Sequence, residues 1–167
     1  MKMEENNKHV QPNSKEEGVQ RLNRILSESL IKATDTYKTP PQIIWVDNSS
    51  IATLGNFSAS TGKAKSKKTF NVCAIVAAAM TGGTVLNYSA SLPPEKRGIL
   101  YVDTEQSKFH CKRMLSRTLR LAGLSAEVHP ACLEFLCLRG FATKDRLKKI
   151  EEAIYAVSYT HLTLPTN

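Results

Sequence analysis

The chain has 167 residues, of which 41% are hydrophobic and 23% are charged. This balance is typical of a globular domain with a buried core and excludes a disordered or fibrous chain. The formal net charge of +8 favours a polyanionic partner such as a nucleotide or a nucleic acid.

Residues 1–15 are polar and mixed in charge, so we expect a flexible N-terminal arm. The arm lacks a hydrophobic signal core, and no apolar run in the sequence approaches the roughly 20 residues that cross a bilayer. We therefore expect a cytoplasmic protein without a membrane segment. The cysteines lie in apolar patterns without a Cys-x-x-Cys spacing, which favours buried, reduced thiols over disulfides or zinc ligands. These cysteines are Cys73, Cys111, Cys132 and Cys137.

Residues 16–39 are predicted to form an amphipathic helix and a linker. From about Glu16 to Thr34, apolar residues recur at intervals of three and four positions. They are Val19, Leu22, Ile25, Leu26 and Leu30. The resulting apolar face needs a partner, which is either the core of the same chain or a neighbouring subunit.

Residues 40–156 are predicted to form the main domain, and it begins with a hairpin. Pro40 and Pro41 end the helical region, and Gln42–Val46 follows as an apolar strand. A polar turn, Asp47–Ser50, then precedes a second strand, Ile51–Phe57, that leads into the next motif.

Residues 62–69 read Gly-Lys-Ala-Lys-Ser-Lys-Lys-Thr, which matches the phosphate-binding template Gly-x-x-x-x-Gly-Lys-Ser/Thr except at Lys67. Gly62 permits a sharp turn, Lys68 neutralises β- and γ-phosphate charge, and Thr69 offers its hydroxyl to Mg²⁺. The helix predicted from about Thr69 to Met80 directs its positive end at the same phosphates. The alternative is a basic surface turn before a buried helix. The predicted binding residues are Gly62, Lys63, Ala64, Lys65, Ser66, Lys67, Lys68, Thr69 and Phe70.

A second candidate site follows the apolar strand predicted after Gly98. Asp103 and Glu105 stand at its carboxyl end, and alternation places both on one face if the extended conformation persists to Glu105. One acid can then orient an attacking water while the other, Asp103, supports Mg²⁺. The alternative is that the acids cap the next helix, as Thr104 or Ser107 also could.

The next predicted helix, Lys108–Leu121, leaves a basic face outside its apolar stripe. This face carries Lys108, Lys112, Arg113, Arg117 and Arg120. It could contact DNA phosphates or an acidic surface of another subunit, or it is simply solvated. A strand at Glu134–Leu138 and a helix from Thr143 complete an alternation that predicts an α/β fold, a parallel sheet flanked by helices.

Taken together, the loop, Thr69-Phe70 and the strand ending in Asp103-Thr104-Glu105 resemble the RecA-like P-loop ATPases over residues 41–155. The resemblance is closest to the RepA-like, AAA-type ATPases of the hexameric replicative helicase type, found on plasmids and mobile elements. It implies a RecA-like core that binds ATP and Mg²⁺, with Lys68 stabilising phosphate charge and Glu105 as the general base. It also implies a homo-oligomeric, hexameric ring that acts on DNA in replication or mobilisation.

The RecA-like fold has a further strand that ends in an aspartate, but residues 157–167 contain no aspartate or glutamate. This segment resembles a translated sequencing-adapter read-through, and we expect it to be a non-native tail on a core that is incomplete at the C-terminus. We therefore expect the chain to hydrolyse ATP slowly or not at all, and the complete parent protein to be an active ATPase.

Two other functions remain open. The first is a non-catalytic DNA-binding or assembly protein in which Lys67 marks a degenerate loop and the basic helix makes the contacts. The second is a small-molecule P-loop kinase, which is disfavoured because no arginine-rich lid segment follows the third strand.

Overall fold

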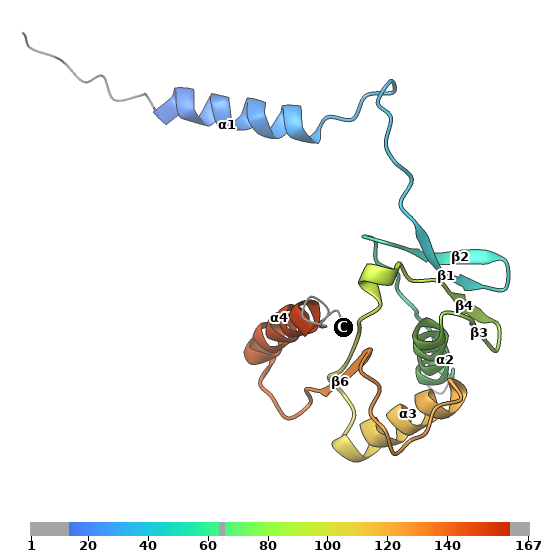
Figure 1. Cartoon of the computed structure of the whole chain (residues 1–167). Coiled ribbons are helices and arrows are strands. Elements are labelled where there is room, and N and C mark those ends of the chain that lie inside the picture. The colour runs from blue at the N-terminus through green and yellow to red at the C-terminus, as the bar shows by residue number, and fades with distance from the viewer. Residues whose placement is uncertain (1–13, 64–65, 161–167) are drawn as a thin grey trace, which may run out of the picture. The chain divides into compact units, whose positions relative to one another are not determined.

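The computed structural model describes residues 14–63 and 66–160, and the chain divides into two units, residues 1–39 and 40–167 (Figure 1). Three stretches with sequence predictions lie outside the described residues. They are residues 1–13 of the predicted arm, Ala64 and Lys65 of the loop, and residues 161–167 of the predicted tail.

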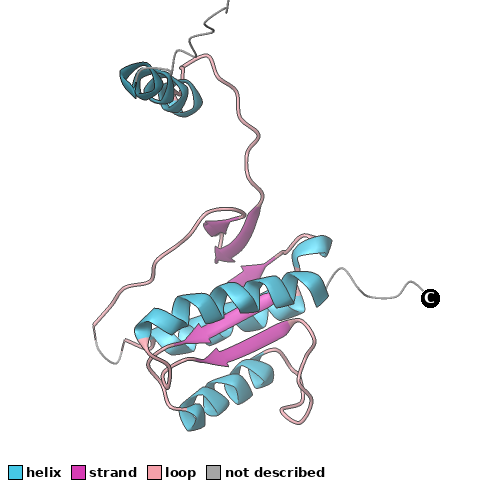
Figure 2. Cartoon of the chain, turned by 90° about the vertical axis from the view of Figure 1, so that its left-hand side faces the viewer, coloured by secondary structure: helices cyan, strands magenta, loops and turns pink. Residues whose placement is uncertain are grey.

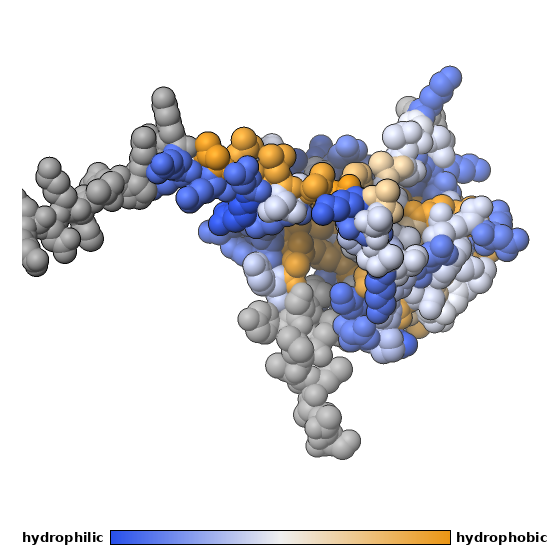
Figure 3. All heavy atoms as spheres, turned by 90° about the horizontal axis from the view of Figure 1, so that it is seen from above, coloured by the Kyte–Doolittle hydropathy of each residue, from blue (hydrophilic) through white to orange (hydrophobic). Residues whose placement is uncertain are grey.

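The first unit contains one helix, α1 (Ser14–Ser29), within its described part. Glu16 and Glu17 stand in its first turn, where negative charge is favourable against the helix dipole. Its apolar residues form a single stripe (orange in Figure 3), and each of them is exposed. The predicted amphipathic helix is therefore confirmed, although it ends at Ser29 and not near Thr34.

The second unit opens with an antiparallel sheet of four strands in the order β2-β1-β4-β3. The predicted hairpin is confirmed, since β1 (Gln42–Val46) pairs antiparallel with β2 (Ser49–Thr53). A second hairpin, β3 (Thr84–Val85) with β4 (Tyr88–Ala90), was not predicted, and β4 pairs with β1. The sheet therefore joins two hairpins that are separated in sequence by a helix.

A separate sheet of two strands is parallel (Figure 2). Its strands are β5 (Ile99–Asp103) and β6 (Leu133–Cys137), in a register that sets Asp103 opposite Cys137. The helix α3 (Lys108–Leu121) connects them, with the bounds that its apolar period predicts. A parallel pair needs such a crossover because its strands run in the same direction.

The prediction of one parallel, RecA-like sheet is wrong. In the part of the chain that the structure describes, only β5 and β6 pair in parallel, and the strand before the loop, β2, belongs to the antiparallel sheet. The physical reason lies in the short connections, because a two-residue turn between β1 and β2 allows only antiparallel pairing. The helix-strand alternation that suggested a parallel sheet holds only from β5 onward.

Helix α2 (Lys68–Thr81) packs against β3, β4, β5 and α3. Alanines form its buried face, and Ala74, Ala77 and Ala78 cluster with Val85 and Ala90 of the antiparallel sheet. Small side chains let the helix backbone approach the sheet closely, which explains why an alanine-rich segment occupies this central position.

Two further helical segments complete the described chain. A short 3₁₀ helix (Pro94–Lys96) precedes β5, and α4 (Thr143–Thr160) follows β6. Helix α4 extends beyond Tyr155, where the sequence suggested its end. Among the described residues, no helix is long and apolar enough to pass through a membrane.

Candidate nucleotide-binding site

The loop before α2 folds back over the side chain of Lys68. The Lys68 ammonium donates to the carbonyl oxygens of Gly62, at 2.5 Å, and Lys63, at 3.1 Å. The backbone N–H of Ser66 also donates to the Lys63 carbonyl, at 3.3 Å, and closes a turn within the loop. The lysine that the sequence assigns to phosphate charge is therefore held beneath the loop by two neutral acceptors.

Gly62 lies close to the side chain of Ser66. A Cβ atom built at Gly62 would lie 2.7 Å from the Ser66 hydroxyl oxygen and 3.4 Å from the Ser66 Cβ. A larger residue at position 62 would therefore make the Ser66 hydroxyl move. This close approach favours glycine, which agrees with its place at the start of the phosphate-loop template.

Lys67 adopts a left-handed backbone conformation, with φ 60° and ψ 20°. It stands where the phosphate-loop template has its second glycine, the residue type that enters this region without a steric cost. The residue that departs from the template thus adopts a conformation that glycine favours. It stores strain, because a left-handed conformation costs a non-glycine residue roughly 1–2 kcal/mol.

Among the described residues, no side chain caps the N-terminus of α2. Lys67 is its N-cap and makes no side-chain capping hydrogen bond, and no acidic residue stands in the first turn. In α3, by contrast, the Ser107 hydroxyl accepts from the backbone N–H of His110 at 3.5 Å. The N–H groups and the positive dipole end of α2 are therefore open to an anion.

An open pocket of about 550 Å³ lies at this end of α2. It is lined by Ser66, Lys67, Lys68, Thr69, Phe70 and Arg117. Five of these were predicted from the sequence as binding residues, and the structure brings them together. Arg117 was predicted only as part of the basic face of α3. Its guanidinium carbon lies 5.9 Å from the centroid of the Phe70 ring.

The two acids predicted for hydrolysis do not line this pocket. The strand β5 ends at Asp103 and residues 104–106 bend, so strand alternation does not carry on to Glu105. One carboxylate oxygen of Asp103 accepts from the backbone N–H groups of Glu105, at 2.9 Å, and Gln106, at 2.6 Å. Asp103 therefore holds the turn before α3, the N-cap of that helix is Ser107 and neither acid, and the Glu105 side chain is exposed.

Thr69 and Asp103, the two residues predicted to face Mg²⁺, differ in their surroundings. Thr69 is exposed and lines the pocket, so its hydroxyl is available to a metal bound with phosphate. Asp103 is partly buried and one of its oxygens is committed to the turn. Within the described residues, no group of three or more metal-binding side chains is assembled. Any metal here would depend on the ligand's own oxygens.

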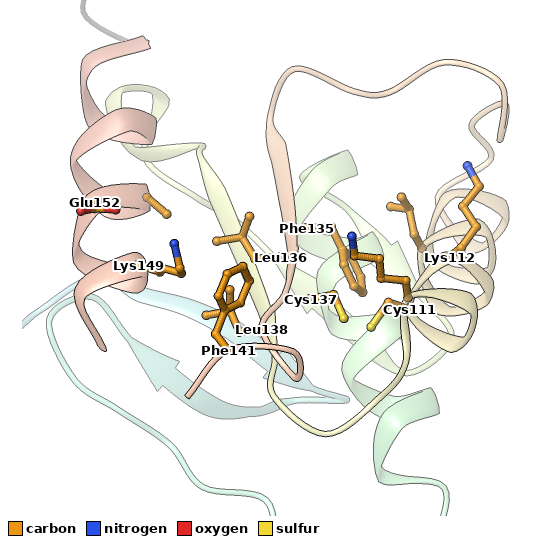
Figure 4. Close-up of a pocket in the computed structure, with 12 residues that line it drawn as sticks. Cys111, Lys112, Phe135, Leu136, Cys137, Leu138, Phe141, Lys149 and Glu152 are labelled. Carbon is orange, nitrogen blue, oxygen red and sulfur yellow. The ribbon is translucent and has the colours of Figure 1, made fainter. Parts of the chain in front are cut away.

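The thiols form a second polar cluster next to Asp103. Cys111 and Cys137 both donate to the carbonyl oxygen of Gln106, at 3.9 and 3.3 Å, and their side chains approach each other (Figure 4). Burial, with the Cys137 hydrogen bond second, raises the pKa of Cys111 to about 12. All four cysteines are free; Cys73 and Cys111 are buried as predicted, whereas Cys132 and Cys137 are only partly buried.

Comparisons with models of protein families, with curated proteins and with solved structures found no match to this chain. The site is therefore described by its own geometry. The loop and its pocket came from a local sequence pattern, whereas Arg117 came from a tertiary contact between α2 and α3. Its position on a basic helix gave no signal that distinguishes it from its neighbours.

Proposed function

We propose that the chain binds a nucleoside triphosphate, ATP in the leading form of the proposal, together with Mg²⁺ at the loop before α2. The observation that carries the proposal is the position of Lys68. Its ammonium is held by the carbonyls of Gly62 and Lys63 beside the uncapped start of α2. A lysine and the backbone N–H groups at the start of a helix form a complementary surface for phosphate oxygens.

Ligand binding changes the partners of these groups. The Lys68 ammonium exchanges neutral carbonyl acceptors for charged phosphate oxygens, which form shorter and stronger hydrogen bonds. The backbone amides at the start of α2 bind the same phosphates, and the Thr69 hydroxyl holds the Mg²⁺ side. Bound Mg²⁺ supplies neutralisation of charge on the phosphate oxygens.

The proposal extends to hydrolysis with Glu105 as the general base and to action on DNA in replication or mobilisation. Glu105 is exposed and lies outside the residues that line the pocket. A substitution at Glu105 should therefore affect hydrolysis without affecting binding: Glu105→Gln should keep the affinity for ATP and remove any turnover. In this view the resemblance to RecA-like ATPases reflects a shared phosphate chemistry.

We place this protein in the cytoplasm and propose that it self-associates, as a hexameric ring in the leading form of the proposal. Free cysteines accord with a reducing compartment. The exposed apolar stripe of α1 is a surface that a second copy can cover. Sedimentation of the chain with and without residues 1–39 would test the role of α1 in assembly, and an unchanged number of subunits would contradict it.

Nucleotide binding is tested by titrating the chain with Mg-ATP in a calorimeter and measuring the dissociation constant. Lys68→Ala should weaken binding at least about tenfold, because hydrogen bonds to charged groups contribute roughly 1.5–3 kcal/mol. Lys144 is an exposed lysine on α4 that does not line the pocket, so Lys144→Ala removes the same charge and serves as the matched control. Equal affinities for wild type and Lys68→Ala would refute the proposal.

A second candidate function, DNA binding without nucleotide, is favoured by the surface of α3. Four of its five basic residues are exposed, and within the described part of the chain none of the four forms an ion pair. They are Lys108, Lys112, Arg113 and Arg120. This function predicts DNA affinity that falls steeply with salt, by a log–log slope of about −0.9 per phosphate contact, and that Lys68→Ala leaves unchanged.

A further inference from the structure

Arg117 differs from the other basic residues of α3. It is partly buried, whereas the remaining four are exposed. It lies in the turn that contains the buried residues Met114 and Thr118, and α3 packs there against α2. Its guanidinium group is consequently directed to Phe70, at the first turn of α2, and away from the exposed basic face.

The residues that line the pocket at α2 are therefore of two chemical kinds. Ser66, Lys68 and Thr69 supply hydroxyl and ammonium groups, and Phe70 and Arg117 supply a ring and a planar cation. A bare phosphate would use only the first kind. A nucleotide carries both phosphates and a flat aromatic base, so it matches both.

We infer that Phe70 and Arg117 form a stacking site for the nucleobase of the bound nucleotide. This inference rests on the proposed function and specifies its ligand as a nucleoside triphosphate. Base–aromatic stacking is strong enough to matter for affinity, and an arginine plane adds a cation–π contribution. Arginine suits this role because its guanidinium is flat and weakly hydrated, whereas a lysine offers only a point charge.

Stacking recognises the face of a base and not its hydrogen-bonding edge. Every base has such a face, so stacking tolerates different bases. Phe70 has no hydrogen-bonding group in its side chain, and the Arg117 guanidinium carbon lies 5.9 Å from the centroid of its ring. The site should therefore bind Mg-ATP and Mg-GTP with affinities within a few-fold of each other.

The test compares three ligands, each with Mg²⁺: ATP, GTP and inorganic tripolyphosphate, which has the phosphates without a base. Arg117→Lys keeps the charge and loses the plane, and Phe70→Leu keeps an apolar side chain and loses the ring. Each variant should weaken ATP and GTP binding about tenfold, the loss of one base-stacking contact, and change tripolyphosphate binding less than about twofold. Lys144→Ala is the control, and thermal unfolding confirms that each variant is folded.

The outcomes separate this inference from the proposed function. If Arg117→Lys and Phe70→Leu bind ATP as wild type does, the stacking site is wrong and the phosphate site stands. The same holds if both variants lose ATP and tripolyphosphate equally, or if wild type binds ATP no more tightly than tripolyphosphate. A wild-type chain that binds none of the three ligands would overturn both.

Discussion

Replacing Lys67 with glycine should stabilise the protein. Lys67 is held at φ 60° as the N-cap of α2, a conformation that costs a non-glycine residue roughly 1–2 kcal/mol. Glycine removes that cost but loses more backbone entropy on folding, about 0.5–1 kcal/mol. From the midpoints of these ranges, the expected net gain in the free energy of unfolding is about 0.75 kcal/mol, or a rise of roughly 1.5–3 °C in Tm.

The assay is equilibrium unfolding in urea. A change in the midpoint concentration of urea, without a change in how steeply the free energy of unfolding depends on urea, measures the change in stability. Lys67→Ala is the matched control, since it removes the same charged side chain but keeps a Cβ in the left-handed conformation. The difference between the two variants isolates the backbone contribution from the charge. If Lys67→Gly is no more stable than Lys67→Ala, the left-handed conformation is not strained in solution and the reasoning fails.

Three further predictions follow from other parts of the structure. Burial raises the pKa of Cys111 from 9.0 and of Tyr101 from 10.0, each to about 12. The contribution of these two groups to stability should therefore be fully present below about pH 9 and be lost between pH 9 and 12. Cys111→Ser should flatten the early part of the decline in Tm over this range, and an unchanged profile would contradict this. The Tyr101 and Phe135 rings stack across β5 and β6 with 4.2 Å between their centroids. A double-mutant cycle that replaces each ring with leucine should give a coupling of about 0.5–1.5 kcal/mol in the free energy of unfolding. Additive effects of the two substitutions would refute this prediction. Gly62→Ala places a Cβ 2.7 Å from the Ser66 hydroxyl oxygen and should weaken Mg-ATP binding several-fold. Adding Ser66→Ala removes this hydroxyl and should restore part of the affinity. If Gly62→Ala binds Mg-ATP as wild type does, the loop geometry is contradicted.

Segments with a strong local signal could be predicted from the sequence. The bounds of α3 follow from its apolar period, from Ser107 at its N-cap and from Gly123, which has φ 70° just beyond its end. The hairpin β3–β4 escaped prediction because its strands are very short and Leu86, with φ 56°, stands in its turn. Leucine is not a residue type that marks a left-handed turn.

In the candidate site, too, residues that are close in sequence could be predicted, whereas a residue that depends on a tertiary contact could not. Gly62 and Lys68 are close in sequence, so the phosphate-loop template could predict their association. Arg117 reaches the pocket only because α3 packs against α2, and no spacing in the sequence encodes that contact. Asp103 was predicted to face Mg²⁺ because alternation was extended beyond the last residue of β5.

The error in the sheet has a consequence for how the site is held together. The loop follows β2 of the antiparallel sheet, whereas Asp103 and Glu105 follow β5 of the parallel sheet, and the two sheets share no paired strand within the described residues. Helix α2 contacts both sheets and carries Lys68 and Thr69 at its start. The distance between the loop and the two acids is therefore set by side-chain packing on α2 and not by hydrogen bonds between strands. Packing of this kind is sensitive to a change of a single methylene group, so the alanines of α2 govern how the candidate phosphate site lies relative to Glu105.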